Sequence, residues 1–564
     1  MAGNWDHTTD LLVVGSGAGA MTTALVAHDR GARVLLLEKS DRYGGSTAMS
    51  GGAVWVPQNP CMAEAGLTDS AEEAATYLRQ VVGQAVSEER LQAYIDEAPE
   101  MVRYLLDNSQ VAFEALSKYP DYYPELAGGK PGGRSMESIP FNARKLGDTL
   151  KDLRPSHPQE LVMGRVGLTA GEAHVVVTGG LRGVLKMASL MLKYFLDFKA
   201  RRAGRRDHRL VLGNALVGRL RASLADRDVP LWLRAGAEDL IVEGGRVVGA
   251  AVRRDGELIR IRADKGVVLA AGGFARNQAM RSAHQRAPTT ESWSAANPHN
   301  TGDAIRMGTS LGAAVELMHE AWWTPTTKIP GKDYAWILVV EKSMPHSIMV
   351  NAAGQRFTNE AAPYVDVVNG MYDANSATAP SIPAWLIFDG RFRKNYPCGP
   401  LPPGRFQPDE RLPRKYREQF MHREATLEAL AERIGVDPAG LRATVDAFNE
   451  NARRGVDPDF KRGDSAYDRY YSDPKVKPNP NLGPLETAPY YAIEVFPGDL
   501  GTKGGLVTDA SARVLTEAGA TIPGLWAIGN CSASVMGVSY PGAGGTIGPA
   551  MAFGYVAARD AIPQ

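Results

Sequence analysis

Short apolar runs in the first part of the chain predict buried strands. Leu11–Val14 and Arg33–Leu37 are almost continuously apolar, which is typical of parallel strands covered on both faces. Val267–Gly273 has the same character and ends in small residues. Between the first two runs, Met21–Asp29 resembles a helix, so the chain begins with a predicted strand–helix–strand unit.

Longer periodic segments predict helices, and stretches rich in Gly, Pro and polar residues predict connections. Helices are expected over 71–82, 88–108 and 546–561, with two more inside 426–452. Short strands are expected over 229–252, with a hairpin at Gly244–Gly245, and near 347–351. Loops are expected over 126–180, 398–413 and 474–488.

The turn after the first strand has the sequence of a dinucleotide site. Gly15-Ser16-Gly17-Ala18-Gly19-Ala20 is a G-x-G-x-x-A turn, and Glu38 closes the second strand about 20 residues further on. Gly15 permits the tight turn, and Gly17 lets the backbone approach a pyrophosphate. The helix that follows offers N–H groups and a partial positive charge to the phosphates.

The residues after Glu38 favour FAD over NAD. Tyr43-Gly44-Gly45-Ser46-Thr47 stands where NAD-binding folds usually continue into a helix, and glycine-rich backbone there suits a longer, extended dinucleotide. Near the C-terminus a predicted strand ends at Gly529-Asn530, where flavoproteins commonly have Gly-Asp. An amide would then contact a hydroxyl in place of a carboxylate. Since no second dinucleotide fingerprint appears, NAD is not expected.

Composition excludes several classes. The 564 residues have a net charge of +0, which gives no electrostatic case for nucleic-acid binding. Cys61, Cys398 and Cys531 stand far apart without a C-x-x-C pair, so we expect no metal site and no disulfide scaffold. The N-terminus lacks the pattern of a secretory signal, and no apolar run reaches about 18 residues. These features predict a cytoplasmic protein without a membrane span.

The distribution of these motifs predicts an α/β fold with two domains. We expect residues 1–290 and 489–564 to form a discontinuous, Rossmann-like FAD-binding domain, with a helical excursion over about 61–210. Residues 291–488 differ in character and are predicted to be an inserted α+β catalytic domain that holds the substrate.

With these motifs in place, the chain resembles the bacterial 3-ketosteroid Δ1-dehydrogenases of the fumarate reductase/succinate dehydrogenase flavoprotein superfamily. The resemblance covers nearly the whole chain and is carried by GSGAGAMTTA, EKSDRYGGSTAMSGGAVWVP, PDYYPE, NTGDAI, NEAAPYV, PGDLGTKGGLVTD and SYPGAGGTIGPA. Fumarate reductases place His and Arg where this chain has Gly501-Thr502-Lys503-Gly504-Gly505. A C4 dicarboxylate substrate is therefore not expected.

The resemblance implies non-covalent FAD, an active site between the domains and a 3-ketosteroid substrate, with cholest-4-en-3-one among the candidates. It also implies an external electron acceptor, such as a quinone or a dye. By motif it assigns catalytic positions to Tyr122 of PDYY, Tyr364 of NEAAPY, and Tyr540 and Gly544 of SYPGAGG.

Desaturation beside a ketone explains why such residues are needed. The C2 hydrogen is acidic because the C3 ketone can become an enolate, whereas the C1 hydrogen must leave as hydride to the flavin. The Tyr540 O–H and Gly544 N–H would hold the ketone oxygen. Tyr364 would take the proton, as a phenolate or by passing its own proton on, since its ordinary pKa is about 10. Tyr122 would relay that proton or stabilise the phenolate; alternatively, these tyrosines are core residues.

The expected cofactor contacts lie in the glycine-rich segments and at the ends of the adjacent strands. They are Gly15, Ser16, Gly17, Ala18, Gly19, Ala20, Glu38, Lys39, Ser40, Gly45, Ser46, Thr47, Ser50, Gly51, Gly52, Ala237, Ala271, Gly272, Gly273, Asp303, Gly529, Asn530, Gly545, Thr546 and Ile547. The helix that begins near Thr546 is expected to aim its N-terminus at the pyrimidine end of the isoalloxazine ring.

Two alternatives to this function stay open. The first is a 3-ketosteroid Δ4-(5α)-dehydrogenase, which would use a similar ketone clamp to desaturate C4–C5. The second is a flavoprotein that binds FAD and a steroid without reaction.

An apolar and basic segment, 181–206, has two interpretations. Its apolar residues are Leu185, Leu190, Met191, Tyr194, Phe195, Leu196 and Phe198, and its basic residues are Lys186, Lys193, Lys199, Arg201, Arg202, Arg205 and Arg206. It is either a core helix with a solvated basic end or an interfacial helix that binds membranes peripherally through 185–206. The sequence leaves both open.

Overall fold

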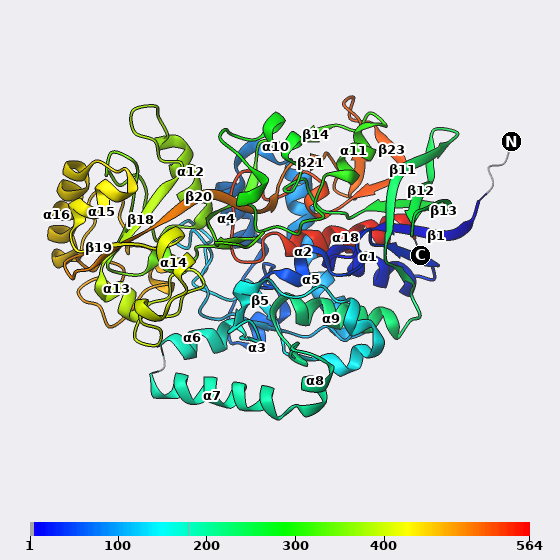
Figure 1. The fold of residues 1–564 in the computed structure, drawn as a ribbon. Coiled ribbons are helices and arrows are strands. Elements are labelled where there is room, and N and C mark those ends of the chain that lie inside the picture. The colour runs from blue at the N-terminus through cyan, green and yellow to red at the C-terminus, as the bar shows by residue number, and fades with distance from the viewer. Residues whose placement is uncertain (1–4, 179, 564) are drawn as a thin grey trace.

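The computed structural model describes residues 5–178 and 180–563, which form two main sheets with helices packed around them (Figure 1). The larger sheet contains the predicted strand–helix–strand unit. β1 (His7–Val14) pairs in parallel with β2 (Val34–Leu37) on one side and with β13 (Glu257–Leu269) on the other. These strands are buried on both faces, as their continuous apolar runs predicted.

The C-terminal part of the chain returns to this sheet. β23 (Thr521–Ala527) lies parallel to β13, and α18 (Ile547–Ala561) follows it and packs against α1 (Ala18–Asp29). The glycine at position 19 permits a close approach of the two helices. Any other residue there would place its Cβ 2.5 Å from the Ala550 carbonyl oxygen. α1 begins at Ala18, earlier than the predicted Met21, with Gly17 as its N-cap.

An antiparallel hairpin extends the same sheet on the side of β13 that faces away from β1. β11 (Ala235–Glu243) and β12 (Arg246–Arg254) are joined at Gly244 and Gly245, which have φ angles of 58° and 77°. The predicted hairpin is confirmed. Positive φ at both central residues is what glycine permits.

The second sheet is antiparallel and forms the opposite end of the molecule from the two termini (Figure 1). Its central strand is β20 (Tyr490–Thr502), flanked by β15 (Ala321–Lys328) and β18 (Ala384–Phe388), with β17 (Ser347–Val350) beyond. β20 is missing from the sequence-based expectations. It is buried along almost its whole length, so it carries no alternation of apolar and polar residues.

Helices pack on the second sheet. α15 (Leu427–Ile434) and α16 (Pro438–Arg454) confirm the two helices expected within 426–452. α12 (Tyr364–Ala374) lies against β15. Because every strand that pairs with β20 in the described residues belongs to this sheet, we propose that the inserted domain extends beyond the predicted limit of 488 to Thr502. The domain limits otherwise stay a prediction.

The excursion over 61–210 contains both helices and short strands. α4 (Ala71–Val82) and α5 (Glu88–Asn108) have the predicted bounds, and their N-caps, Ser70 and Ser87, accept hydrogen bonds from first-turn N–H groups. A small antiparallel sheet was not foreseen. It consists of β3 (Val54–Trp55), β4 (Phe113–Ala115) and β5 (Ser135–Ser138), which are too short for a periodic signal.

The segment 181–206 is a pair of consecutive surface helices rather than one core helix. α6 (Ala170–Thr178) precedes it, and the segment itself divides into α7 (Leu181–Leu196) and α8 (Phe198–Ala203), which run along the lower edge of the molecule in Figure 1. The helical structure is interrupted at Asp197, whose side chain caps the N-terminus of α8. Among the apolar residues, Leu190 and Tyr194 are buried, but Phe195 and Phe198 are 51% and 70% exposed. The core interpretation is therefore wrong for most of this segment.

No helix in the described parts of the chain is both long enough and apolar enough to cross a membrane.

Candidate active site

A cavity of about 580 Å³ lies at the carboxyl ends of the parallel strands and continues toward the second sheet. Gly15 follows β1 and Glu38 follows β2, so the dinucleotide motif forms one wall. The three tyrosines assigned by motif form part of another. This is the edge of a parallel sheet at which α/β proteins bind ligands.

The first wall fits the dinucleotide half of FAD. Gly15 has a φ of +123°, and a Cβ there would lie 2.2 Å from the Ala270 carbonyl oxygen, so only glycine fits this turn. Gly17, the N-cap of α1, has no side chain to cap the helix, which leaves room for a phosphate at its N-terminus. The Glu38 carboxylate is buried beside this turn and accepts a hydrogen bond from the Ser16 hydroxyl at 2.5 Å. It stands where a ribose would be bound.

Most of the predicted cofactor residues line this cavity, and three do not. Ser40, Gly273 and Gly545 are outside its wall. The Ser40 N–H donates to Glu38 Oε1 at 2.9 Å, so Ser40 orients the carboxylate. A side chain at Gly273 would place its Cβ 2.0 Å from Thr502 Oγ1, which shows that this glycine serves packing. All other residues named in the sequence analysis as cofactor contacts lie in the wall.

The cavity wall also contains residues that the sequence analysis missed. Asn297, His299 and Asn300 lie in it, and the Asn300 amide donates to the Ser46 hydroxyl at 3.0 Å. Only the neighbouring Asp303 was selected from the motif NTGD. Its carboxylate accepts from the Lys39 ammonium at 2.6 Å, which joins two of the predicted contacts.

Tyr122, Tyr364 and Tyr540 come together from three distant segments. Their ring centroids are 5.1–5.4 Å apart, and all three are buried. The hydroxyls of Tyr122 and Tyr364 form a hydrogen bond, and the Tyr540 hydroxyl lies 3.0 Å from Thr546 Oγ1. The Tyr122 N–H donates to the Pro541 carbonyl at 3.0 Å, which ties the PDYY loop to the SYPGAGG loop.

Burial disfavours the ionised form of these tyrosines. It raises the pKa of Tyr364 and of Tyr122 well above the ordinary value, and it also raises the pKa of Tyr540. Tyr364 is the first residue of α12, where the helix dipole favours negative charge. The start of the helix and the hydrogen bond with Tyr122 thus oppose the effect of burial and favour the phenolate form of Tyr364, which can take a proton.

Gly544 lies on the cavity beside Tyr540, and its backbone conformation requires glycine. Its φ is +99°, and a Cβ would lie 2.5 Å from both the Ala53 carbonyl carbon and the Trp55 nitrogen. Thr546 and Ile547, at the start of α18, also line the cavity. The orientation of this helix toward a bound isoalloxazine ring stays a prediction.

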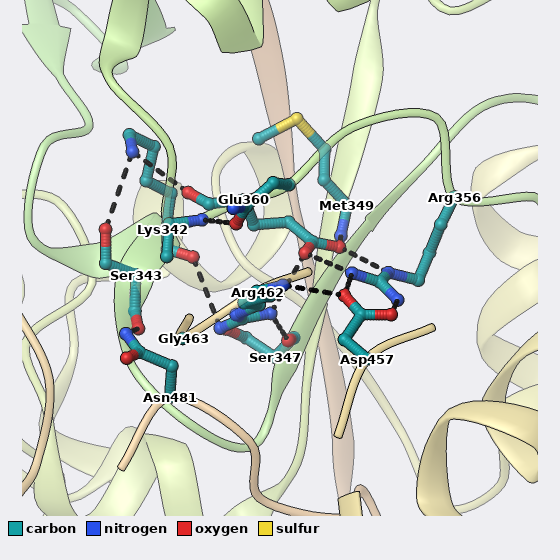
Figure 2. Close-up of polar contacts among 12 residues, drawn as sticks. Lys342, Ser343, Ser347, Met349, Arg356, Glu360, Asp457, Arg462, Gly463 and Asn481 are labelled. Atoms are coloured by element: carbon teal, nitrogen blue, oxygen red, sulfur yellow. Dashed lines mark hydrogen bonds and ion pairs between the residues drawn. The ribbon is translucent and has the colours of Figure 1, made fainter. Parts of the chain in front are cut away.

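A buried ionic network anchors the segment that precedes Tyr364 (Figure 2). Arg356 donates to both oxygens of Glu360, at 2.8 and 2.7 Å, and also pairs with Asp457. Arg462 reaches the same carboxylate at 3.1 Å. Burial alone would raise the pKa of Glu360, but the two guanidinium groups lower it to about 2.

Lys342 completes the anchor on the backbone. Its ammonium is fully buried and donates to the carbonyls of Glu360, at 2.9 Å, and Ala362, at 2.7 Å (Figure 2). Burial lowers the pKa of Lys342 to about 7. The last residues before the start of α12 are therefore held from two sides, and with them the position of Tyr364.

The far part of the cavity, beyond Tyr122, is bordered by aromatic and acidic side chains. The Tyr119 hydroxyl lies 2.7 Å from that of Tyr471, and both residues line the wall together with Glu160. Burial raises the pKa of Glu160 to about 7. α6 closes this part through Ala170 and Ala173, so the excursion borders the cavity directly.

Comparison with known proteins agrees with this geometry. The family model described as FAD binding domain matches residues 10–547. The chain is 45% identical over 571 residues to a 3-oxosteroid 1-dehydrogenase of Mycobacterium tuberculosis (strain ATCC 25618 / H37Rv), with 98% of each chain covered. It superposes with a TM-score of 0.95 on the 3-ketosteroid delta1-dehydrogenase of Sterolibacterium denitrificans in complex with 1,4-androstadiene-3,17-dione, at 48% identity over 99% of both chains.

A more distant solved structure shares the fold alone. The 3-ketosteroid-delta4-(5alpha)-dehydrogenase of Rhodococcus jostii RHA1 gives a TM-score of 0.67 at 22% identity, with 100% of this chain and 99% of that chain covered.

Proposed function

The chain belongs to the family of FAD-dependent 3-oxosteroid 1-dehydrogenases, and we propose that it removes the hydrogens at C1 and C2 of a 3-ketosteroid. The observation that carries this proposal is the cluster of Tyr122, Tyr364 and Tyr540 beside Gly544, at one end of a cavity whose other end fits FAD. This arrangement fits a ketone substrate whose oxygen accepts hydrogen bonds from the protein.

The chemistry of each residue indicates its role in the reaction. Tyr540 and Gly544 present an O–H and an N–H for the C3 oxygen, where negative charge develops as the C2 proton leaves. Tyr364 takes that proton as a phenolate, which the Tyr122 hydroxyl stabilises by donating a hydrogen bond. FAD, when bound, supplies a hydride acceptor for the hydrogen at C1.

Anaerobic mixing with steroids tests the function. Androst-4-ene-3,17-dione and cholest-4-en-3-one should each bleach the yellow flavin and yield the 1,4-diene-3-one. The saturated 5α-androstane-3,17-dione separates the alternatives, because a Δ1 enzyme forms a 1-ene and a Δ4-(5α) enzyme forms a 4-ene. A flavin that no steroid bleaches would mean a binding protein without this activity. Purified protein without a flavin spectrum, even after addition of FAD, would contradict the assigned cofactor.

Reoxidation of the reduced protein identifies the acceptor. We propose a quinone or a dye-like compound, since the chain carries a single dinucleotide fingerprint. Menadione or dichlorophenolindophenol should restore the flavin absorbance, and NAD⁺ should not.

Tyr540→Phe is expected to lower kcat by about 10²–10³, because one donor to the developing oxyanion is removed. The flavin spectrum should be unchanged. Tyr396→Phe is a suitable control, since the Tyr396 hydroxyl donates to Asp473 in the inserted domain, outside the cavity wall. Wild-type turnover by Tyr540→Phe would exclude its hydroxyl from the ketone clamp.

We further propose that the protein lies in the cytoplasm and binds membranes peripherally through α7 and α8. The side chains of Leu181, Val184, Leu185, Leu192, Phe195, Leu196 and Phe198 are all more than half exposed. Arg182, Lys193, Lys199, Arg202 and Arg205 are exposed around them. An apolar face framed by cations fits an interface with anionic headgroups.

Not every basic residue of the segment is available for lipid. Lys186 pairs with Glu172 at 3.0 Å, and Arg206 donates to backbone carbonyls and to Asn214. The location nevertheless suits a lipid substrate, because α6 packs on α7 and also lines the cavity. A sterol that leaves the bilayer at α7 would be separated from the cavity by α6.

Co-sedimentation with anionic vesicles tests this proposal. The variant Leu192→Ser/Phe195→Ser/Phe198→Ser should lose vesicle binding and keep its turnover of androst-4-ene-3,17-dione. Leu258→Ser/Phe406→Ser is a matched control, because both residues are exposed elsewhere on the surface and should not affect binding. Equal binding by wild type and the triple variant at low salt, or none by either, would reject the membrane contact.

A further inference from the structure

Tyr123, the neighbour of Tyr122, has partners of its own. Its hydroxyl donates to Asp366 Oδ1 at 3.0 Å and accepts from the Ser539 hydroxyl at 3.1 Å. Tyr123 does not line the cavity. It is therefore not placed to touch substrate, although it follows a residue that is.

Each member of this trio belongs to a segment that carries one of the clustered tyrosines. Tyr123 follows Tyr122, Ser539 precedes Tyr540, and Asp366 stands in the first turn of α12, which Tyr364 begins. The three segments are distant in sequence. The trio is thus a second point of contact among them, separate from the contacts between the tyrosine rings.

A buried lysine secures one corner of the trio. The Lys503 ammonium is fully buried and donates to the Ser539 carbonyl. It also lies 4.6 Å from the ring centroid of Trp322, whose ring packs against Tyr540 at a centroid distance of 4.6 Å. The Ser539–Tyr540 step is consequently held through both its backbone and its aromatic side chain.

We propose that Tyr123 is a positioning residue, whose hydroxyl sets the register of the three segments that carry Tyr122, Tyr364 and Tyr540. This inference rests on the proposed function. Tyr122 and Tyr540 lie in irregular segments without a ladder of backbone hydrogen bonds to fix their positions. A side chain that bonds to both other segments adds a constraint to the Tyr122–Pro541 bond, which joins only two of them.

The position of Asp366 depends on its hydrogen bond from Tyr123. Burial raises the pKa of Asp366 to about 6, and the hydrogen bond from Tyr123 acts in the opposite direction. A half-buried carboxyl that loses its donor must find another partner or move. Because Asp366 is in the same helical turn as Tyr364, its movement shifts the base. A displacement of about 1 Å at a reacting group costs about 10²-fold in rate.

Tyr123→Phe removes the hydroxyl and keeps the ring. The expected result is a fall of about ten-fold or more in kcat. FAD content, the dissociation constant of the steroid and the melting temperature should stay near wild type. The isotope effect on anaerobic flavin reduction by a C2-deuterated steroid should increase, since proton abstraction becomes slower. A purely structural role would instead lower the melting temperature and leave the isotope effect unchanged.

Partner variants and a control complete the test. Asp366→Asn retains an acceptor for Tyr123 and should lose less kcat than Asp366→Leu. The double variant Tyr123→Phe/Asp366→Leu should be little worse than Asp366→Leu alone. Tyr104→Phe is the matched control, because Tyr104 donates to Asp29 at 2.5 Å far from the tyrosine cluster, and its kcat should not change.

Two results would overturn the inference while leaving the function intact. One is wild-type kcat in Tyr123→Phe, and the other is full additivity in the double variant. Absence of steroid turnover by the wild type would instead overturn the proposed function, and this inference with it.

Discussion

Tyr364→Phe is expected to lower kcat by a factor of about 10²–10⁴, the range that general acid–base catalysis contributes. The variant keeps the buried ring and loses only the oxygen that takes the C2 proton. Burial raises the pKa of Tyr364, whereas the hydrogen bond with Tyr122 lowers it and so favours the phenolate that takes the proton. Single-turnover flavin reduction measures the effect directly.

Two further variants show whether a loss of kcat in Tyr364→Phe comes from the proton-accepting oxygen. Tyr122→Phe should lose less than Tyr364→Phe, because it removes only the donor that stabilises the phenolate and keeps the phenolate itself. Tyr372→Phe is a control on the same helix, since Tyr372 donates to the Pro288 carbonyl at 3.1 Å and lies outside the cavity wall. Near wild-type kcat in Tyr364→Phe would mean that another group takes the proton.

Glu360→Gln is expected to destabilise the protein by about 3–5 kcal/mol, the usual cost of removing one partner from a buried ion pair. Arg462 is fully buried and would lose its carboxylate, whereas Arg356 would keep Asp457. The midpoint of urea denaturation, monitored in the holoenzyme, measures the loss. Glu418→Gln is a control, because its pair with Arg414 is exposed and should contribute little.

The same variant should reveal a dependence on pH. The folded-state pKa of Glu360, about 2, lies below that of an unfolded glutamate, which is about 4.3. The carboxylate therefore stabilises the fold fully above about pH 5, and this stabilisation is lost as the pH falls toward about 2. The difference in denaturation midpoint between wild type and Glu360→Gln should narrow over that interval. A constant difference would show that Glu360 is not ionised in the fold.

The position of Tyr364 illustrates what a motif does not contain. The resemblance assigned Tyr364 a role, but no local pattern predicted its place at the first residue of a helix. That place depends on Glu360, which is held by Arg462 from a segment about a hundred residues away (Figure 2). Pairings of this kind have no local pattern, because any of the 63 Lys and Arg residues could serve equally well by composition.

The surface segment 181–206 is a second example. The sequence predicted a helix in this apolar and basic segment, but not the direction that its apolar side chains would face. Only the packed structure shows that Leu190 and Tyr194 turn inward and that most of the others remain exposed. Whether an apolar face is covered depends on which elements the rest of the chain places beside it.

The sequence by itself determined the dinucleotide unit from Leu11 to Glu38, because a strand, a glycine turn and a helix in direct succession are fixed by neighbouring residues. It also determined α4, α5 and α18, whose periodic patterns or capping residues are local. The tertiary structure alone decided the central place of β20, the assembly of Tyr122, Tyr364 and Tyr540, and the network around Tyr123. These features join segments hundreds of residues apart, and their geometry depends on how the two sheets pack rather than on any one stretch of sequence.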